Sequence, residues 1–305
     1  MKNQIDMHET VVHNLFPPQA DGAPKTGPPA GGAQKIGTPT VTNMRLYTII
    51  IATFIGATAG HAQSPYVLDP GREWLLFGSG GALGISGLIA RNNVAPLTIE
   101  QINALDPSDV NRFDRGAIKP YHEALASDAI TGVSVFLPLT FLANKQIRQD
   151  WKIVGVMWGE TLLLQSGLNA LVKGLSQRTR PYVYNENTPL SRKTTSDARA
   201  SFYSGHIGTT AAMSFFTAKV FSDYVADRRS RIVLWGAAAT LPVVVGTLRV
   251  ESGHHFPSDV IVGYVTGAAI GYLVPELHKV KTPINISIEP SHISGTPAVQ
   301  LAYRF

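Results

Sequence analysis

Three short blocks hold most of the polar residues that can converge on one site in an otherwise apolar half of this 305-residue chain. They read K-G-L-S-Q-R-T-R-P from Lys173, S-F-Y-S-G-H from Ser201 and L-R-V-E-S-G-H-H-F-P-S-D from Leu248. Together they offer basic side chains, imidazoles, a carboxylate and a Ser-Gly turn. Such a set suits a doubly charged phosphate and a histidine that attacks it.

The first block places two cations near the end of an apolar segment. Lys173 ends that segment, and Arg180 follows seven residues later, which is two helical turns. Pro181 disfavours helix at Arg180, so we expect the helix to end earlier and Arg180 to turn back toward the same pocket. A guanidinium can bind two phosphate oxygens at once, whereas lysine acts as a point charge. Taken alone, the pair also fits basic residues at the interfacial end of a membrane helix.

The second block is a turn before an apolar helix expected to begin near Ile207. Helix N-termini carry free backbone N–H groups and a partial positive charge, and Gly205 allows close approach of the backbone to an anion. His206 would face a phosphate from this turn. An equally simple interpretation of Ser204 is that it caps the helix.

The third block pairs a histidine with an acid. Arg249 ends one predicted helix, and Pro257 suits the first position of the next. Asp259 lies one helical turn after His255, where its carboxylate can hold one imidazole nitrogen and present the other as a nucleophile. His254 is the neighbouring candidate, but the four-residue spacing favours His255. Buried structural His-Asp pairs with no catalytic role are also common.

Considered together, the blocks resemble the type 2 phosphatidic acid phosphatase superfamily, whose pattern is K-x6-R-P, P-S-G-H and S-R-x5-H-x3-D. The first block matches fully. Tyr203 stands where the family usually has proline, and Leu248 where it usually has serine. Both departures affect the shape of the pocket and leave the reacting groups in place. The resemblance covers roughly residues 74–278.

The resemblance implies a metal-independent phosphatase that uses no cofactor and hydrolyses phosphate monoesters or diphosphates. His255 would attack phosphorus and form a phosphohistidine, Asp259 would orient it, and His206 would protonate the leaving alkoxide. The phosphate-binding groups implied are Lys173, Arg180, Ser204, Gly205 and Arg249. No metal ligands are expected among these residues. Related alternatives are a vanadium-dependent haloperoxidase, a soluble periplasmic non-specific acid phosphatase, and a non-catalytic phosphate-binding membrane protein.

Six apolar segments predict the scaffold, an all-α six-helix bundle. They are residues 74–90, 129–143, 153–172, 207–221, 232–248 and 260–277. Two features favour a membrane-embedded bundle: residues 233–248 are apolar on all sides, and glycines recur every four residues in the last segment at Gly263, Gly267 and Gly271. Glycines at this spacing also occur in closely packed soluble bundles.

The regions that flank the bundle have different compositions. Residues 1–43 are rich in Pro and Gly and are predicted to be a disordered extension. Residues 44–62 have the pattern of a secretory signal peptide, or form an N-terminal membrane helix, and Met44 is a candidate for the true start. Residues 63–280 form the expected phosphatase domain. Residues 281–305 alternate apolar and polar positions and predict a β-hairpin.

Charge placement predicts the sidedness of the bundle. The basic connections at residues 145–152 and 228–231 should face the cytoplasm, which leaves the three blocks on the periplasmic or outer side. If the signal is cleaved, the segment after Gln63 starts outside, and strict alternation of the spans would place the three blocks inside the cell. The charge-based prediction then holds only if the first segment does not span or the bundle is soluble in the periplasm.

Composition narrows the partners. A net charge of +5 without a basic-aromatic run argues against nucleic acid as a partner. The resemblance implies a phosphorylated lipid or another phosphate ester as the substrate, and the bilayer as the surroundings. The absence of cysteine excludes disulfides, thiolate metal sites and a cysteine nucleophile. The sequence indicates neither the lipid nor the oligomeric state.

Overall fold

A computed structural model describes residues 64–280, 285–293 and 296–304. The expected disordered extension at residues 1–43 and the expected signal peptide or membrane helix at residues 44–62 lie outside the described residues. Each of the six apolar segments lies within helical structure. The corresponding helices are α2 (Pro70–Asn92), α5 (Leu125–Val135) followed by the 3-10 helix η2 (Leu137–Ala143), α7 (Trp151–Ser176), α9 (Gly205–Tyr224), α10 (Arg228–Glu251) and α11 (Pro257–His278).

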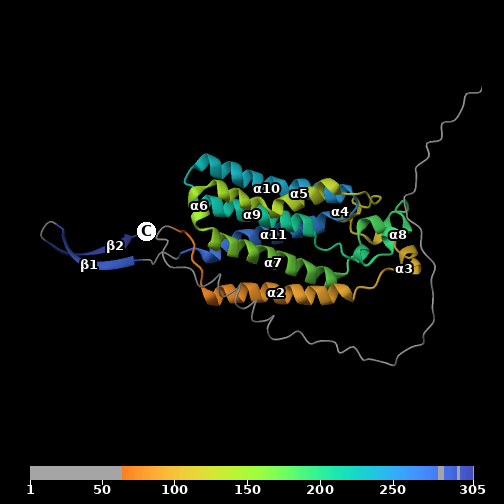
Figure 1. Ribbon diagram of the computed structural model, residues 1–305, viewed down its shortest axis with the longest axis horizontal. Helices are drawn as coiled ribbons and strands as arrows, with labels where there is room; N and C mark the ends of the chain where they lie inside the picture. Colours follow the sequence, from red (N-terminus) through yellow and green to blue (C-terminus); the bar gives the residue numbers. More distant parts are fainter. Residues whose placement is uncertain (1–63, 281–284, 294–295, 305) are drawn as a thin grey trace, which may run out of the picture. The chain divides into compact units, whose positions relative to one another are not determined.

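Helix α9 is the element around which the others pack. It contacts α5, α7, α10 and α11, while α2 lies along α7 (Figure 1). Its side chains are buried almost all round, including Ile207, Met213 and Phe216. A helix that is apolar on every side must be surrounded by other elements, and this explains its central place.

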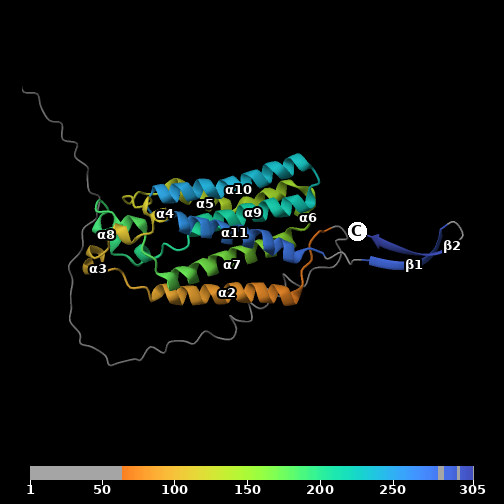
Figure 2. The same cartoon turned by 180° about the vertical axis from the view of Figure 1, so that it is seen from behind.

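Short elements gather at one end of the long helices (Figures 1 and 2). They include α3 (Ile99–Asn103), η1 (Pro107–Asp109), α4 (Arg112–Arg115), η3 (Pro181–Tyr184), α8 (Leu190–Lys193) and η4 (Ser196–Arg199). Small apolar clusters, one of them formed by Val110, Ala117 and Phe256, hold these connections together. At the opposite end lie α6 (Lys145–Gln149) and the start of α10.

Glycines bring α11 and α9 into backbone contact. A Cβ atom on Gly267 or Gly271 would overlap the carbonyl oxygens of Gly208 and Ala212, and one on Gly263 would lie 2.6 Å from the Ser204 oxygen. The predicted glycine ridge of α11 therefore packs directly on α9, which fixes the start of α9 against the start of α11.

Among the described residues, three helices are long and apolar enough to cross a membrane, namely α2, α10 and α11. A fourth span results if α5 and η2, which are bent by 43°, count as one. Large apolar side chains such as Leu75, Leu88, Val233 and Val265 point outward and are more than half exposed. An apolar outer surface of this kind is compatible with a lipid environment.

Two strands are described near the end of the chain. Strand β1 (Asn285–Ile293) pairs antiparallel with β2 (Thr296–Arg304), with Ile288 opposite Leu301. Residues 294–295 and the start of the predicted hairpin at residues 281–284 lie outside the described residues.

Candidate active site

The three blocks meet at the end of the long helices where the short elements gather. The first follows the end of α7, the second begins α9, and the third joins the end of α10 to the start of α11. The charges of Arg180, Lys173, Arg249 and His206 all act on the imidazole of His255, so the groups predicted from sequence surround this side chain.

Arg180 turns back into the pocket, as predicted. Helix α7 ends at Ser176, before Arg180, and Gln177 follows with a left-handed φ of 44°. The Arg180 Nη1 donates to the His254 carbonyl oxygen at 3.0 Å and lies 3.3 Å from the His255 Nε2. Its Nη2 pairs with Asp197 Oδ1 at 3.1 Å. These contacts hold a guanidinium next to the proposed nucleophile.

Lys173, in the last turn of α7, is only 7% exposed. Within the part of the chain that the structure describes, its ammonium makes no ion pair within 4.0 Å. A buried cation without a counter-ion is costly, so this group is suited to bind an anion that enters the pocket.

Ser204 does not cap α9 through its side chain. Its hydroxyl is fully buried and has no hydrogen-bond partner among the described residues. The turn is held by Asn169 instead, whose Nδ2 donates to the Tyr203 carbonyl oxygen at 2.8 Å. A Cβ atom on Gly205 would lie 2.6 Å from Asn169 Oδ1, so any larger residue here would displace the Asn169 side chain that holds the turn. The capping interpretation of Ser204 is therefore wrong, and its hydroxyl is available for a ligand.

His255 is a buried, neutral imidazole. Its Nδ1 lies 3.7 Å from Asp259 Oδ2, beyond hydrogen-bond distance, and has no hydrogen-bond partner among the described residues. Burial, followed by the charges of Arg180 and Lys173, lowers the pKa of His255 well below its usual range. Deprotonated imidazole is the form that can act as a nucleophile.

The neighbouring His254 has different surroundings. Its Nδ1 lies 2.9 Å from Ser252 Oγ, and its ring packs 5.0 Å from the ring centre of Tyr121 and 5.9 Å from that of Tyr182. Burial lowers the pKa of His254 to about 3. These contacts are those of a core histidine, which agrees with the preference for His255.

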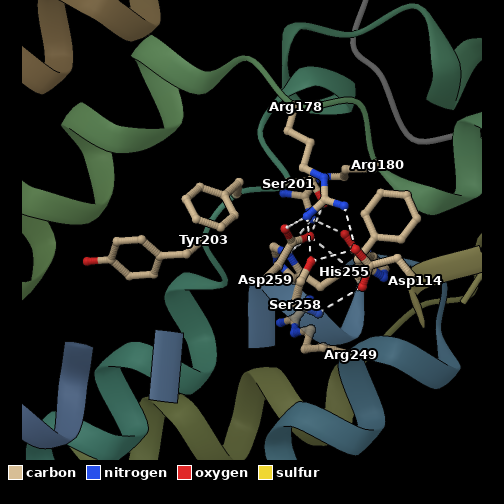
Figure 3. A network of polar contacts seen from close by, with 12 residues as sticks. Asp114, Arg178, Arg180, Ser201, Tyr203, Arg249, His255, Ser258 and Asp259 are labelled. Atoms are coloured by element: carbon tan, nitrogen blue, oxygen red, sulfur yellow. Dashed lines mark hydrogen bonds and ion pairs between the residues drawn. The ribbon is translucent and has the colours of Figure 1, made fainter. Parts of the chain in front are cut away.

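A network that sequence reasoning missed fixes the carboxylate of Asp259 (Figure 3). Ser201 Oγ donates to Oδ2 and Arg178 Nη1 donates to Oδ1, each at 2.5 Å, and the Phe256 N–H donates to Oδ2 at 2.9 Å. Arg178 and Ser201 lie within the three blocks, but nothing in their spacing distinguishes them from the neighbouring polar residues. The carboxylate is therefore held in place before any substrate binds.

Asp114 in α4 extends this network. Its Oδ2 accepts from Arg178 Nη2 at 2.8 Å and from Ser258 Oγ at 2.7 Å. Burial alone would raise the pKa of Asp114, but the hydrogen bonds from Ser258, Asn111 and Arg178 outweigh it and lower that pKa. Because Asp114 lies far from the blocks in a polar connection, no sequence signal identifies it.

A second missed acid faces the other side of the pocket. Asp128 in α5 pairs through Oδ1 with Arg249 Nη2, and the same oxygen lies 3.0 Å from His206 Nε2. The side chains of Asp128 and His206 are partly exposed, at 49% and 35%. Arg249 is otherwise buried, and its Nε has no partner among the described residues. Asp128 thus contacts both His206, the predicted general acid, and Arg249, a predicted phosphate-binding residue.

The arrangement is a cationic pocket with unfilled hydrogen-bonding capacity. The charges of Lys173 and Arg249 act on the His255 imidazole, and the Ser204 hydroxyl and the Arg249 Nε have no hydrogen-bond partner among the described residues. Each of these groups can donate to an anionic oxygen. A phosphate group fits these requirements, and a nucleophile stands beside it.

Comparison with known families agrees with this chemistry. Residues 155–283 match the family model described as the PAP2 superfamily, which confirms the resemblance to the type 2 phosphatidic acid phosphatases. A match to this superfamily implies phosphatase or haloperoxidase-type activity. No curated protein and no solved structure matches the chain.

Proposed function

We propose that this protein is a metal-independent phosphatase that cleaves a lipid phosphate or diphosphate, and the match of residues 155–283 to the PAP2 superfamily model supports this. The proposal assigns residues 63–280 to a six-helix phosphatase domain in the cell membrane, with its site on the periplasmic or outer side and residues 281–305 as a hairpin tail. One observation carries it: His255 is buried among the charges of Lys173, Arg180 and Arg249. Nearby, the Ser204 hydroxyl and the Arg249 Nε have no hydrogen-bond partner among the described residues.

In the first step the Nε2 of His255 attacks phosphorus. A P–N bond forms, the P–O bond to the leaving group breaks, and His206 gives a proton to the departing alkoxide. Burial and the charges of Lys173 and Arg180 lower the pKa of His206 to about 4 in the free protein, so His206 takes up this proton once the negative charge of the bound phosphate offsets those cations. The imidazole becomes a phosphohistidine that carries positive charge. Asp259 stabilises that charge through Nδ1, and the 3.7 Å gap between Nδ1 and Oδ2 is expected to shorten in the substrate complex.

In the second step water cleaves the intermediate. His206, now unprotonated, takes a proton from the water as its oxygen attacks phosphorus, and the P–N bond returns its electron pair to His255. Inorganic phosphate leaves, and both histidines recover their starting states. Lys173, Arg180 and Arg249, with the Gly205 N–H, stabilise the charge on the equatorial oxygens in both steps.

An apolar groove beside the site supports a lipid substrate. A cavity of about 420 Å³ lies between α10 and α11, and its lining runs from Val250, next to Arg249, to Val265. Val243 and Ile261 on its border are about half exposed. A hydrocarbon chain in this groove would place its headgroup near His255.

Phosphate release from purified protein tests the function. We expect turnover of lipid phosphates or diphosphates above that of soluble phosphate esters, with activity retained in excess EDTA because the reacting groups are histidines. Preference for soluble esters would remove the lipid assignment. Complete, metal-reversible inhibition by EDTA of protein that remains folded would contradict the mechanism, whereas loss of activity through unfolding would concern structure alone. Halide oxidation by peroxide after addition of vanadate, without phosphatase activity, would instead identify a haloperoxidase.

A further inference from the structure

A second cluster of ionisable side chains lies at the opposite end of the bundle from the candidate active site. Glu73 in the first turn of α2, Glu160 in α7 and His278 at the end of α11 are all fully buried. Along α11, His278 is ~28 Å from Asp259 at 1.5 Å per residue. The proposed phosphatase chemistry uses none of these three residues.

The three side chains present their donor atoms to one point. Nε2 of His278 lies 3.2 Å from Glu73 Oε2 and 3.2 Å from Glu160 Oε2. Neither contact has hydrogen-bond geometry: Nε2 and both oxygens of Glu160 lack a hydrogen-bond partner within the described ranges. Buried groups without partners are rare in folded proteins and require an explanation.

Neighbouring groups orient two of the three side chains. Nδ1 of His278 lies 2.7 Å from the Val274 carbonyl oxygen and therefore carries a proton. In the neutral ring the Nε2 lone pair is then free to bind a metal ion. Glu73 Oε1 accepts from the Asp69 N–H and from Arg72 Nη2, each at 2.8 Å. A histidine that donates one ring N–H to a carbonyl and a carboxylate held by outer hydrogen bonds are typical of metal ligands.

We propose that Glu73, Glu160 and His278 bind a first-row divalent cation such as Zn²⁺ or Mn²⁺. Metal–ligand bonds of ~2.0–2.2 Å place neighbouring ligand atoms ~3.0–3.5 Å apart, which matches the separations around Nε2. Carboxylate and imidazole ligands suit these ions. The cation links α2, α7 and α11 at their common end and acts as a structural staple.

Charge balance separates this site from a simple ion pair. The two buried carboxylates face only one nearby cation, Arg72, which contacts Glu73 and not Glu160. A protonated His278 would neutralise the cluster, but its Nε2–H would then point at a carboxylate oxygen, and neither oxygen lies in line with it. A cation on the Nε2 lone pair satisfies Nε2 and both carboxylates together.

Metal content and thermal unfolding of the full-length protein test the site. Protein purified in detergent, stripped with chelator and re-titrated with Zn²⁺ or Mn²⁺ should bind about one equivalent by elemental analysis. The midpoint of thermal unfolding should rise by about 5 °C or more when the free metal concentration is a hundred times the dissociation constant. Co²⁺ should give visible absorption bands, because its d–d transitions report coordination by protein ligands.

Variants place the effect at this cluster. E160Q keeps the size of the side chain and should lose both the bound equivalent and the metal-dependent rise in midpoint. E276Q is the matched control: Glu276 is a nearby carboxylate on α11 that pairs with Lys219 and should leave both readouts unchanged. If E160Q does not fold, the wild-type titration decides alone. Wild-type protein without bound metal and with an unchanged midpoint on titration overturns the proposal, as does an E160Q protein that responds to metal like wild type.

Discussion

Asp128 Oδ1 lies 3.0 Å from Nε2 of His206, and the same oxygen pairs with Arg249. The proposed general acid and a proposed phosphate ligand therefore share one carboxylate in the substrate-free protein. A phosphate group that binds Arg249 must compete with this carboxylate or tolerate its negative charge.

We expect D128N to bind oxyanions more tightly. The substitution removes one negative charge close to the pocket, and a charge a few ångströms away is worth ~1 kcal/mol in a solvated site, or about fivefold in affinity. Inhibition of phosphate release by orthovanadate measures this change, with E123Q as the control because Glu123 is an exposed acid that pairs with Arg192. Weaker inhibition of D128N than of wild type would show that Asp128 supports oxyanion binding instead.

Ser201 is expected to act through Asp259. Its hydroxyl donates to Oδ2 at 2.5 Å, and loss of a hydrogen bond to a charged group costs ~1.5–3 kcal/mol, so S201A should lower kcat by about tenfold to a hundredfold. KM should change little, because Ser201 does not bind the substrate. S176A is the control, since Ser176 bonds only the Phe202 carbonyl oxygen. Equal losses in the two variants, or a change confined to KM, would rule out a positioning role.

Acid should destabilise the protein through its buried histidines. The pKa of His254 is lowered to about 3 and that of His255 lies well below its usual value. The unfolded chain therefore binds more protons than the native protein below about pH 6.5, so stability is complete above that pH and falls as the solution is acidified.

The unfolding midpoint should drop between about pH 6.5 and pH 4. The slope should be shallower in H254Q, which removes one of three histidines with a lowered pKa, the third being His206 at about 4. Parallel midpoint curves for wild type and H254Q would contradict this assignment of the proton linkage.

Much of the site was predictable because its chemistry is local in sequence. Lys173 and Arg180 are linked by one short connection, and His255 and Asp259 by one helical turn, so spacing alone indicated that each pair could act together. Proline at position 181 indicated where α7 must end. The six apolar segments likewise predicted the long helices, because long helices that pack in a bundle require long, mainly apolar stretches of sequence.

The remaining parts depend on contacts between elements that are distant in sequence. Asp114 reaches Arg178 across 64 positions, and Asp128 reaches Arg249 across 121. A single acid in a polar connection has no spacing partner, so sequence cannot distinguish it from a solvated residue. The same holds for Glu73 and Glu160, which become neighbours only when α2 packs along α7.

Sidedness is testable with one introduced thiol, because the chain has no cysteine. Ser191 in α8 is exposed at the end where the three blocks meet, whereas the basic connections lie at the other end. S191C should react with a membrane-impermeant reagent in intact cells, after permeabilisation of any outer membrane. The matched variant S230C, at the start of α10, should react only after lysis. The reverse pattern would place the site in the cytoplasm, and release of the protein by osmotic shock would show a soluble bundle.

Phosphate release by H255A, measured beside H254A, tests the central claim most directly. The account predicts that H255A loses turnover by at least about a thousandfold while remaining folded, as is usual when a covalent nucleophile is removed. It also predicts that H254A keeps substantial activity, because the side chain of His254 packs against Tyr121 and Tyr182. Near-normal turnover by H255A together with loss of turnover by H254A would contradict the account, since the nucleophile would then be the other histidine.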